Sequence, residues 1–436
     1  MSEGSEWGRP ESRSSRPSRA WRSRKLVLGS KALRSGRERN QSSRAPVALV
    51  SRFALPVPQF VDANRSVIAQ DPRDYWRELQ AGSVFRDLSG YFLLTRREDV
   101  AAALRDYATF SSHRKPLTTP GAAVKSLPIP VPIAYDPPAH SRFRRILQPY
   151  FSSRAADDLL PLLRRQALAL INAVAPDGGC EAISDIADPF PFGVLVSLCG
   201  LPSEDRDKLA ALADVNWDTP GSPPGSELFN YLAEAISSDQ RPALATKLLT
   251  GDDPLTEEEV IAFYALLCLA QDGMQGGIGS VLLRLARNPQ LRSLLRDNPD
   301  QIGAFAEEIV RLETPLPFIG RFTTKAVTIA GVTIPAGSVV RLCLASTNLD
   351  GTEKPSVNVT DDGEIRPTPH WGFGGGVHRC LGAALARMEL TVIVAEWLRV
   401  VPDFELEPDF APSFTFTQGG AIKPSSLPLR WGQPRS

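Results

Sequence analysis

The chain has 436 residues, of which 42% are hydrophobic and 22% charged, and its formal net charge is +0. This is the composition of an ordinary globular protein with a large core. Its five widely scattered cysteines exclude a disulfide framework, and no apolar run approaches the length of a membrane-spanning helix. We therefore expect a soluble protein of the cytoplasm, where thiols stay reduced.

The first 46 residues differ in kind from the rest. They contain 12 Lys+Arg against 4 Asp+Glu, with many serines and few apolar residues, whereas the remainder carries 37 basic and 45 acidic residues. Such a segment does not bury enough apolar surface to fold. We expect a disordered, functionally neutral tail over residues 1–46 and a single domain over residues 47–436. A transit-like peptide, a nucleic-acid-binding arm and a start codon placed too early are the alternatives.

The first elements of the domain follow simple local patterns. Residues 91–95 indicate a strand and residues 98–105 a helix. The stretch 115–132 is rich in proline and glycine and indicates a loop. Much later in the chain, residues 327–337 indicate a short hairpin.

A basic helix is predicted to begin near Asp136, which is followed by two prolines. His140 and Arg144 lie four residues apart on it and therefore share one face. A histidine and a guanidinium that converge on one point form a carboxylate site, and arginine binds a carboxylate through two hydrogen bonds. The other interpretation is an ordinary basic helix face.

A long apolar helix is predicted to begin at Thr256. Thr256 and Glu259 form a capping box, and residues 261–270 are almost wholly apolar, as expected of a buried helix. The glycine-rich stretch that follows contains Asp272 and Gly273. A charged residue in such an apolar helix is costly unless it has a partner or a function. A kink of the helix, bridged by water, is the structural alternative.

Residues 301–312 predict a second helix with a regular apolar face, formed by Ile302, Phe305, Ile309 and Leu312. Glu308 and Arg311 lie three residues apart, so they share one side of this helix and can pair. By itself, such a pair is usually exposed and contributes little to stability.

The most informative segment is the decapeptide 373–382, Phe-Gly-Gly-Gly-Val-His-Arg-Cys-Leu-Gly. It places Cys380 between a glycine-rich loop and an apolar helix, whose stripe consists of Leu381, Leu385, Met388, Val392 and Ala395. A thiol just before a helix N-terminus lies at the positive end of the helix dipole, and His378 or Arg379 adds positive charge. Both effects favour the thiolate, which is the metal-binding form.

A lone cysteine of this kind suits few metal sites. Zinc and iron–sulfur centres need several ligands at short spacing, and the preceding cysteine here is Cys343. A single thiolate does suit heme iron, because the porphyrin supplies the in-plane ligands. A buried free cysteine is the structural alternative.

The decapeptide resembles the heme-binding loop of the cytochromes P-450, whose pattern is Phe-x-x-Gly-x-His/Arg-x-Cys-x-Gly. Every fixed position of that pattern is met, by Phe373, Gly376, His378, Cys380 and Gly382. The resemblance implies that heme b (iron protoporphyrin IX) is the cofactor and Cys380 the axial iron ligand. It also implies that His378 contacts a heme propionate and that Phe373 and Gly382 belong to the cofactor site.

Other segments resemble the same family in the expected order, over roughly residues 50–432. Glu308 and Arg311 resemble the buried, structural Glu-x-x-Arg pair of the family's K helix, and Asn358 aligns with the place of its usual partner arginine. His140 and Arg144 resemble the propionate-binding pair of the C helix. Arg321 occupies the position of another propionate-binding arginine.

The central helix departs from the family pattern Ala/Gly-Gly-x-Asp/Glu-Thr. Asp272 aligns with the acid, which the resemblance assigns to proton delivery during oxygen activation, and Gly273 replaces the threonine. A one-residue shift would place Gly273 on the acid and Met274 on the alcohol. Without this hydroxyl, a substrate hydroxyl or an extra water would order the proton-carrying waters, or the reaction would be oxidative coupling or desaturation.

The resemblance implies a mainly α fold with small β-sheets, in which heme lies between the central long helix and the helix after the cysteine loop. It implies a bacterial-type monooxygenase of secondary metabolism that inserts one oxygen atom of O2 into a C–H bond of an apolar small molecule. A non-enzymatic heme sensor is a more distant alternative. Residues 115–132 would cover the substrate pocket, with Leu269, Leu316, Phe318 and Phe416 in its walls.

Only 56 residues follow Cys380 in the 436-residue chain, too few for a fused reductase. We therefore expect electrons from a separate ferredoxin and ferredoxin reductase. We expect no nucleic-acid partner and no membrane anchor.

Overall fold

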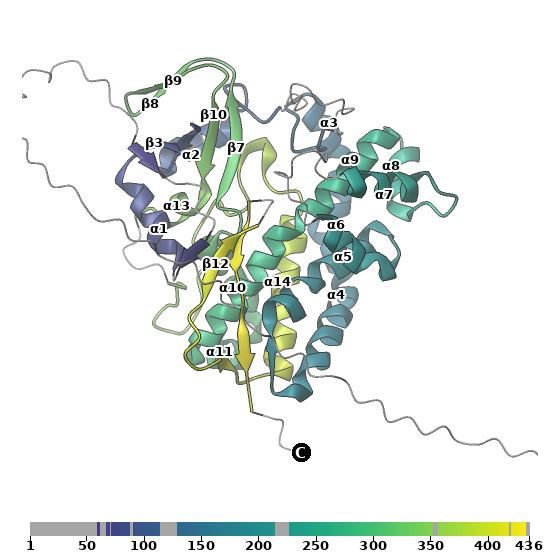
Figure 1. Cartoon of the computed structure of the whole chain (residues 1–436), viewed down its shortest axis with the longest axis vertical. Helices are drawn as coiled ribbons and strands as arrows, with labels where there is room; N and C mark the ends of the chain where they lie inside the picture. The colour runs from purple at the N-terminus through teal and green to yellow at the C-terminus, as the bar shows by residue number, and fades with distance from the viewer. Residues whose placement is uncertain are drawn as a thin grey trace, which may run out of the picture. The chain divides into compact units, whose positions relative to one another are not determined.

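The structure is a computed structural model, drawn in Figure 1. It describes residues 59–61, 67–69, 71–87, 90–113, 129–213, 226–351, 356–417 and 420–432. These residues belong to one compact unit, Ala54–Ser436. The predicted tail and most of the predicted loop 115–132 lie outside the described residues, so both stay predictions.

The described residues are mostly helical, as predicted. The helices are α1 (Pro72–Glu78), α2 (Arg97–Arg105), α3 (Ala139–Leu147), α4 (Ser153–Val174), α5 (Pro189–Cys199), α6 (Arg206–Ala213), α7 (Ser226–Ser237), α8 (Ala243–Thr250), α9 (Glu257–Leu269), α10 (Gln271–Arg287), α11 (Pro289–Asp297), α12 (Ile302–Glu313), α13 (Leu344–Leu349) and α14 (Ala383–Val400). Within the described residues, no helix is both long and apolar enough to cross a membrane.

The strands form small sheets. They are β1 (Gln59–Val61), β2 (Val67–Ala69), β3 (Val84–Asp87), β4 (Phe92–Leu94), β5 (Phe110–Ser111), β6 (Gly179–Glu181), β7 (Phe318–Thr323), β8 (Val327–Ile329), β9 (Val332–Ile334), β10 (Val339–Cys343), β11 (Glu405–Leu406), β12 (Ser413–Phe416), β13 (Ile422–Pro424) and β14 (Pro428–Arg430). The largest sheet has the order β1-β3-β4-β10-β7-β5, and its β1–β3 and β4–β10 pairs are parallel. Two further sheets have the orders β11-β14-β6 and β13-β12-β2, and the predicted hairpin is β8–β9.

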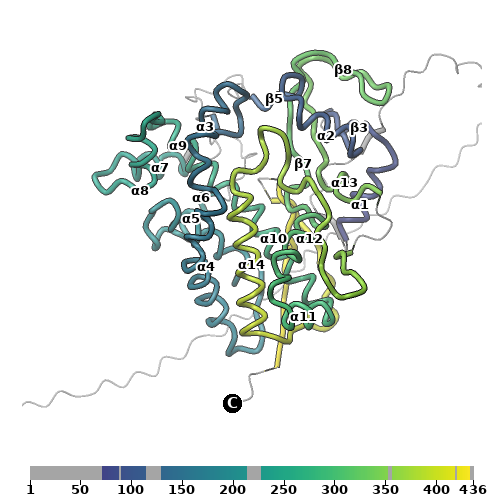
Figure 2. Tube along the Cα trace, turned by 180° about the vertical axis from the view of Figure 1, so that it is seen from behind, coloured from purple at the N-terminus to yellow at the C-terminus, as the bar shows by residue number. Residues whose placement is uncertain are grey.

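The core is built around α14. Helices α4, α10 and α12 all pack against it, and Figure 2 shows them side by side. Because α14 meets helices on several sides, it buries more than the predicted stripe; Leu390, Ile393, Val394 and Trp397 are buried as well. A second apolar cluster joins α5 to α9 with the end of α3.

The central helix starts as predicted but is broken in the middle. Thr256 and Glu259 form the capping box at the start of α9. The helix is interrupted at Ala270, and α10 resumes at Gln271, whose side-chain amide donates to the carbonyl of Leu267 at 2.7 Å. A side chain that bonds into the helical ladder beside a glycine-rich segment is a recognised cause of such a break. The structure therefore shows a one-residue interruption in the region where a kink was the structural alternative to a functional Asp272.

Glycines of α10 let strand β13 approach this helix closely. A Cβ at Gly276 would collide with the carbonyl oxygen of Ile422, and a Cβ at Gly279 would lie 2.9 Å from the side chain of Ile183. A Cβ at Gly273, by contrast, would meet no atom within 4 Å. The part of α10 from Gly276 onward is therefore in tight contact with β13, whereas the first turn of the helix at Gly273 faces open space.

Alanine substitutions at two of these glycines form a matched pair. We expect Gly276→Ala to lower the free energy of unfolding by about 1–3 kcal/mol, because backbone must move to admit the methyl group. Gly273→Ala should leave it unchanged or raise it by up to about 1 kcal/mol, since alanine favours the helix. Chemical denaturation of both variants checks this, and equal effects at the two positions would contradict the packing.

The core also contains a carboxyl group without a partner. Glu389 on α14 is only 4% exposed, and its Oε2 has no hydrogen-bond partner in the structure. Burial raises the pKa of this carboxyl to about 8. The folded protein therefore binds this proton more tightly than the unfolded chain does.

This raised pKa predicts a pH-dependent loss of stability. The protonated Glu389 carboxyl contributes to the free energy of unfolding. This contribution is fully present below the unfolded pKa of about 4.5 and is lost as the pH rises towards about 8. Glu389→Gln cannot ionise, so its melting temperature should exceed that of the wild type at pH 8.5, and the gap should shrink at pH 5. The exposed Glu234→Gln serves as control. Parallel melting curves for Glu389→Gln and the wild type across this range would contradict the prediction.

Candidate active site

The cysteine loop is shaped by its glycines. Gly374 and Gly376 have φ angles of +67° and +62°, and the carbonyl of Leu104 lies where a Cβ at Gly376 would be. The turn brings the N–H of Cys380 to the carbonyl of Phe373 at 2.8 Å. Of the five free cysteines, Cys380 alone is classed as exposed.

The protonation of Cys380 differs from the expectation. Although the side chain reaches the surface, the protein atoms crowded around it reduce its hydration and raise the pKa of the thiol. The N–H of Gly382 and the cation of Arg144 oppose that rise without overcoming it. Without a bound metal, burial by the surrounding protein therefore raises the thiol pKa more than the N–H groups at the helix N-terminus lower it. A coordinating metal removes the thiol proton outright, so the side chain is accessible and becomes a thiolate once a metal is bound.

Open space lies beside this thiol, and similar space is found at two glycines of other elements. A Cβ built at Gly382, beside Cys380, would meet nothing within 4 Å, and the same holds for Gly320 on β7 and Gly273 on α10. Ala270, at the break between α9 and α10, is likewise exposed. Small or missing side chains thus leave room for a flat ligand at the cysteine loop, at β7 and at the central helix.

Basic side chains gather at a second point. His140 on α3 and His378 in the loop have ring centroids 4.3 Å apart, and both are buried. The carboxylate of Asp136 lies 3.4 Å from Nε2 of His378. Burial, together with the charges of His140 and Arg321, lowers the pKa of His378 to about 4.

The guanidinium of Arg321 belongs to the same basic cluster. It is 6% exposed, and burial lowers its pKa to about 10. Among the described residues, Asp136 is the carboxylate that opposes this charge. Burial also lowers the pKa of His140, so the two imidazoles are neutral hydrogen-bonding groups beside the buried Arg321 cation. A guanidinium with neutral donors around it is an arrangement that can bind an anionic group.

Arg144 contacts the cysteine loop directly. Its guanidinium donates to the carbonyl of Arg379 at 2.6 Å and to that of Cys380 at 3.5 Å. Its Nε donates to the side chain of Gln148 at 2.9 Å. The predicted face of α3 therefore meets the loop: His140 lies against His378, and Arg144 against the backbone at the thiol.

The predicted Glu308–Arg311 pair is buried. Glu308 is 0% exposed, and the guanidinium of Arg311 donates to both carboxylate oxygens at 2.9 and 2.8 Å. The backbone N–H groups of Thr368 and Asn358 donate to the same carboxylate at 2.7 and 3.1 Å. Asn358 therefore contributes its backbone N–H at the place where a third charged side chain was sought.

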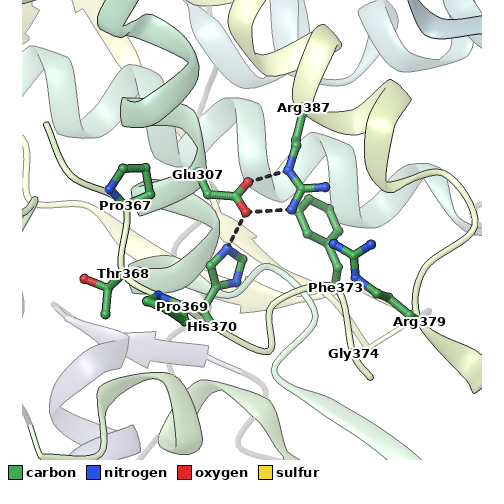
Figure 3. A pocket seen from close by; sticks show the side chains of 9 residues that line it. All are labelled: Glu307, Pro367, Thr368, Pro369, His370, Phe373, Gly374, Arg379 and Arg387. Carbon is green, nitrogen blue, oxygen red and sulfur yellow. Dashed lines mark hydrogen bonds and ion pairs between the residues drawn. The ribbon is translucent and has the colours of Figure 1, made fainter. Parts of the chain in front are cut away.

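A network next to this pair was not predicted. Arg387 donates to both oxygens of Glu307 at 2.5 and 2.6 Å, and Nε2 of His370 lies 3.0 Å from that carboxylate (Figure 3). Burial alone would raise the pKa of Glu307, but the hydrogen bonds from His370 and Arg387 outweigh burial and lower it to about 2. The guanidinium of Arg387 also lies 4.3 Å from the ring of Phe373. The sequence signal was slight, since it consisted of an acid beside Glu308 and an arginine two helices further on, in α14.

The predicted pocket residues lie in two groups. Phe318 and Phe416 stack with centroids 6.5 Å apart, and the buried Trp76 of α1 meets both of them edge-on. Leu269 packs instead at the edge of the α5–α9 cluster. Leu316 is half-buried just before β7. Trp76 was missed because nothing in its local sequence places α1 beside these segments.

Comparisons with known proteins agree with one another. The family model described as "Cytochrome P450" matches residues 233–427. A "Probable cytochrome P450 127A1" of Sinorhizobium fredii is 33% identical over 363 residues, 79% of this chain and 84% of its own length. The chain belongs to the cytochrome P450 family. The "Vitamin D(3) 25-hydroxylase" of Pseudonocardia autotrophica is 32% identical over 77% of this chain and 88% of its own length.

Solved structures give the same result. The crystal structure of "Cytochrome P450 CYP101C1" matches with a TM-score of 0.73 and 30% identity, covering 87% of this chain and all of that one. "P450BioI", solved in complex with an acyl carrier protein, matches with a TM-score of 0.73 and 26% identity over 83% of this chain and 99% of its own. The chain is a bacterial-type P450 monooxygenase with the P450 fold, and heme b is the cofactor of this family.

The residues present fit this cofactor. The accessible thiol suits an axial ligand, and the open space at Gly382 leaves room beside it. The buried Arg321 guanidinium, with the imidazoles of His140 and His378 as hydrogen-bonding groups, suits the propionates. Two of these features meet directly, because His140 lies against His378 of the cysteine loop and Arg144 donates to the carbonyl of Cys380.

Proposed function

We propose that Cys380 is the axial ligand of heme iron and that His140, His378, Arg321 and Arg144 hold the propionates. Heme with a thiolate ligand supplies the activation of dioxygen, because the thiolate donates electron density that favours O–O cleavage. Phe373 and Gly382 frame the thiol. The single observation that carries the proposal is the accessible Cys380 beside open space, with buried basic groups nearby.

The acidic residue on the central helix is proposed as the proton donor. Asp272 lies in the first turn of α10, directly after the break in the helix, and is half-buried. It would hold and pass on the protons that oxygen activation consumes. Gly273 beside it offers room for a substrate hydroxyl or an ordered water in place of the missing alcohol.

The substrate is proposed to be an apolar small molecule whose C–H bond receives one oxygen atom. The half-buried Phe318, Phe416 and Leu316 are the apolar side chains that support this proposal. Related proteins include the "Mycinamicin IV hydroxylase/epoxidase" of Micromonospora griseorubida and the "Nocardicin C N-oxygenase" of Nocardia uniformis, so a place in secondary metabolism is proposed as well.

Oxidative coupling or desaturation is the second candidate, and Gly273 is the observation that favours it. Turnover under ¹⁸O2 separates the two reactions: labelled product supports insertion, and coupled or desaturated product without label supports the second candidate. Bound heme without any product would instead support a sensor.

Electrons are proposed to come from a separate ferredoxin and its reductase. Arg144, Arg379 and Arg387 lie near the thiol, but the structure differentiates them. Arg387 is paired with Glu307, and Arg144 is engaged by the loop backbone. Arg379 is therefore the strongest candidate of the three for an acidic partner. The five free cysteines suit a cytoplasmic location.

The carbonyl spectrum tests the axial ligand. The reduced protein with carbon monoxide should show the strongly red-shifted Soret band of a thiolate-ligated heme, and Cys380→Ala should abolish it. Cys180→Ala, which removes a thiol from β6, should leave the band unchanged. A band typical of histidine ligation, or no bound heme in the wild type, would refute the proposal.

A second experiment tests the proposed role of Asp272 as proton donor. Asp272→Asn should slow oxygen consumption with a surrogate ferredoxin and reductase by about 10²-fold, because a positioned proton donor is lost. Its heme content should match that of the wild type and of the exposed control Asp297→Asn. Oxygen consumption at the wild-type rate would exclude the proposed role of Asp272.

A further inference from the structure

A polar line connects the surface to the central helix beside Asp272. Lys423 of β13 places its Nζ 2.7 Å from Oδ1 of Asp188, at the N-cap of α5, and 3.4 Å from Oε1 of Gln275 on α10. The Asp188 side chain is 38% exposed, that of Lys423 is 19% exposed, and Gln275 is 8% exposed. The three groups thus lead from solvent into the core.

The inner end of this line lies on the same face of α10 as Asp272. Gln275 follows Asp272 by three residues, so the two side chains are neighbours, with Cβ atoms about 5–6 Å apart. Gly276, four residues after Asp272, meets the carbonyl of Ile422, which directly precedes Lys423. Strand β13 therefore begins at α10 one turn after Asp272, on the same side of the helix.

The chemistry of the three groups suits water rather than apolar packing. An ammonium and a carboxylate removed from bulk water are costly unless further hydrogen bonds satisfy them. The Gln275 amide accepts from Lys423 through its oxygen, and this bond does not use its NH2 group, which is a donor. A water between this amide and the Asp272 carboxylate would complete the line.

We propose that Lys423 is a positioning residue that aligns Asp188 and Gln275 into a proton path ending at Asp272. A proton enters from bulk water at Asp188, passes along waters bound to Gln275 and ends on the Asp272 carboxylate. One proton enters for each one that Asp272 releases, and Lys423 keeps its own three. The path substitutes for the water-ordering hydroxyl that Gly273 lacks. This inference rests on the proposed role of Asp272.

An assay driven by dioxygen tests the path without a known substrate, because reduction of O2 takes up protons whereas hydrogen peroxide would bring its own. Heme-loaded protein is given O2 with a surrogate ferredoxin and reductase, and the initial rate of oxygen consumption is measured in H2O and D2O. Lys423→Met should be slower by at least about tenfold, with a larger solvent isotope effect, since loss of positioned proton transfer costs on the order of 10²-fold. Lys423→Arg, which retains the charge and the donors, should restore most of the rate. Lys247→Met, at an exposed lysine of α8, should match the wild type.

A double variant tests whether Lys423 and Asp272 act in the same proton path or independently of each other. If Lys423 acts through Asp272, Lys423→Met with Asp272→Asn should be no slower than Asp272→Asn alone, whereas multiplied losses would overturn the proposal. A normal rate for Lys423→Met with a slow Asp272→Asn would refute the path and leave the role of Asp272 standing. Normal rates for both would refute both.

A crystal structure tests the proposed path independently of any activity measurement. A high-resolution crystal structure of the wild type should show ordered water between the Gln275 amide and Asp272, and that water should be lost or displaced in Lys423→Met. A dry apolar contact there in the wild type would overturn the proposal. Heme content and the carbonyl spectrum should be the same in all variants, which excludes general misfolding as the cause.

Discussion

The position of the thiol depends on one buried ion pair. Glu308 and Arg311 are removed from water, which is costly for both charges unless hydrogen bonds satisfy them. The carboxylate receives the N–H groups of Asn358 and Thr368, and the guanidinium donates to the carbonyl of Ser356 at 3.2 Å. The pair therefore fastens the segment leading to the cysteine loop onto α12. Breaking this ion pair would leave one charge buried without its partner, and it would also release that segment from α12.

The neighbouring network of Glu307, His370 and Arg387 holds the cysteine loop from its other end as well. Glu307 precedes Glu308 on α12 and joins His370, in the loop segment, to Arg387 on α14. Arg387 in turn lies over Phe373, the first residue of the decapeptide. Two neighbouring carboxylates of one helix thus hold the loop both before and after the thiol. This explains how a glycine-rich segment, flexible by composition, presents a cysteine in one orientation.

The opposite wall of the site is shaped by absent side chains. Glycines of α10 admit β13 at Gly276 and Gly279 and leave open space in the first turn at Gly273. The break at Ala270 lies between an apolar half, α9, and a half that carries Asp272 and Gln275. Tight packing, open space and polar side chains therefore meet within two turns of helix. The loss of the family's hydroxyl at Gly273 gives the polar face beside it a larger part in the proposed chemistry.

Local chemistry allowed much of this to be predicted from the sequence. The spacing of Phe373, His378 and Cys380, the capping box at Thr256 and the three-residue spacing of Glu308 and Arg311 are properties of short segments, and short-range hydrogen bonding and helix periodicity determine them. Only the tertiary structure decided which distant groups meet: Trp76 with Phe416, Glu307 with Arg387, and Lys423 with Asp188. It also decided that burial outweighs the helix dipole at the Cys380 thiol. Those outcomes depend on packing between segments up to hundreds of residues apart, and no local pattern of residues encodes such contacts.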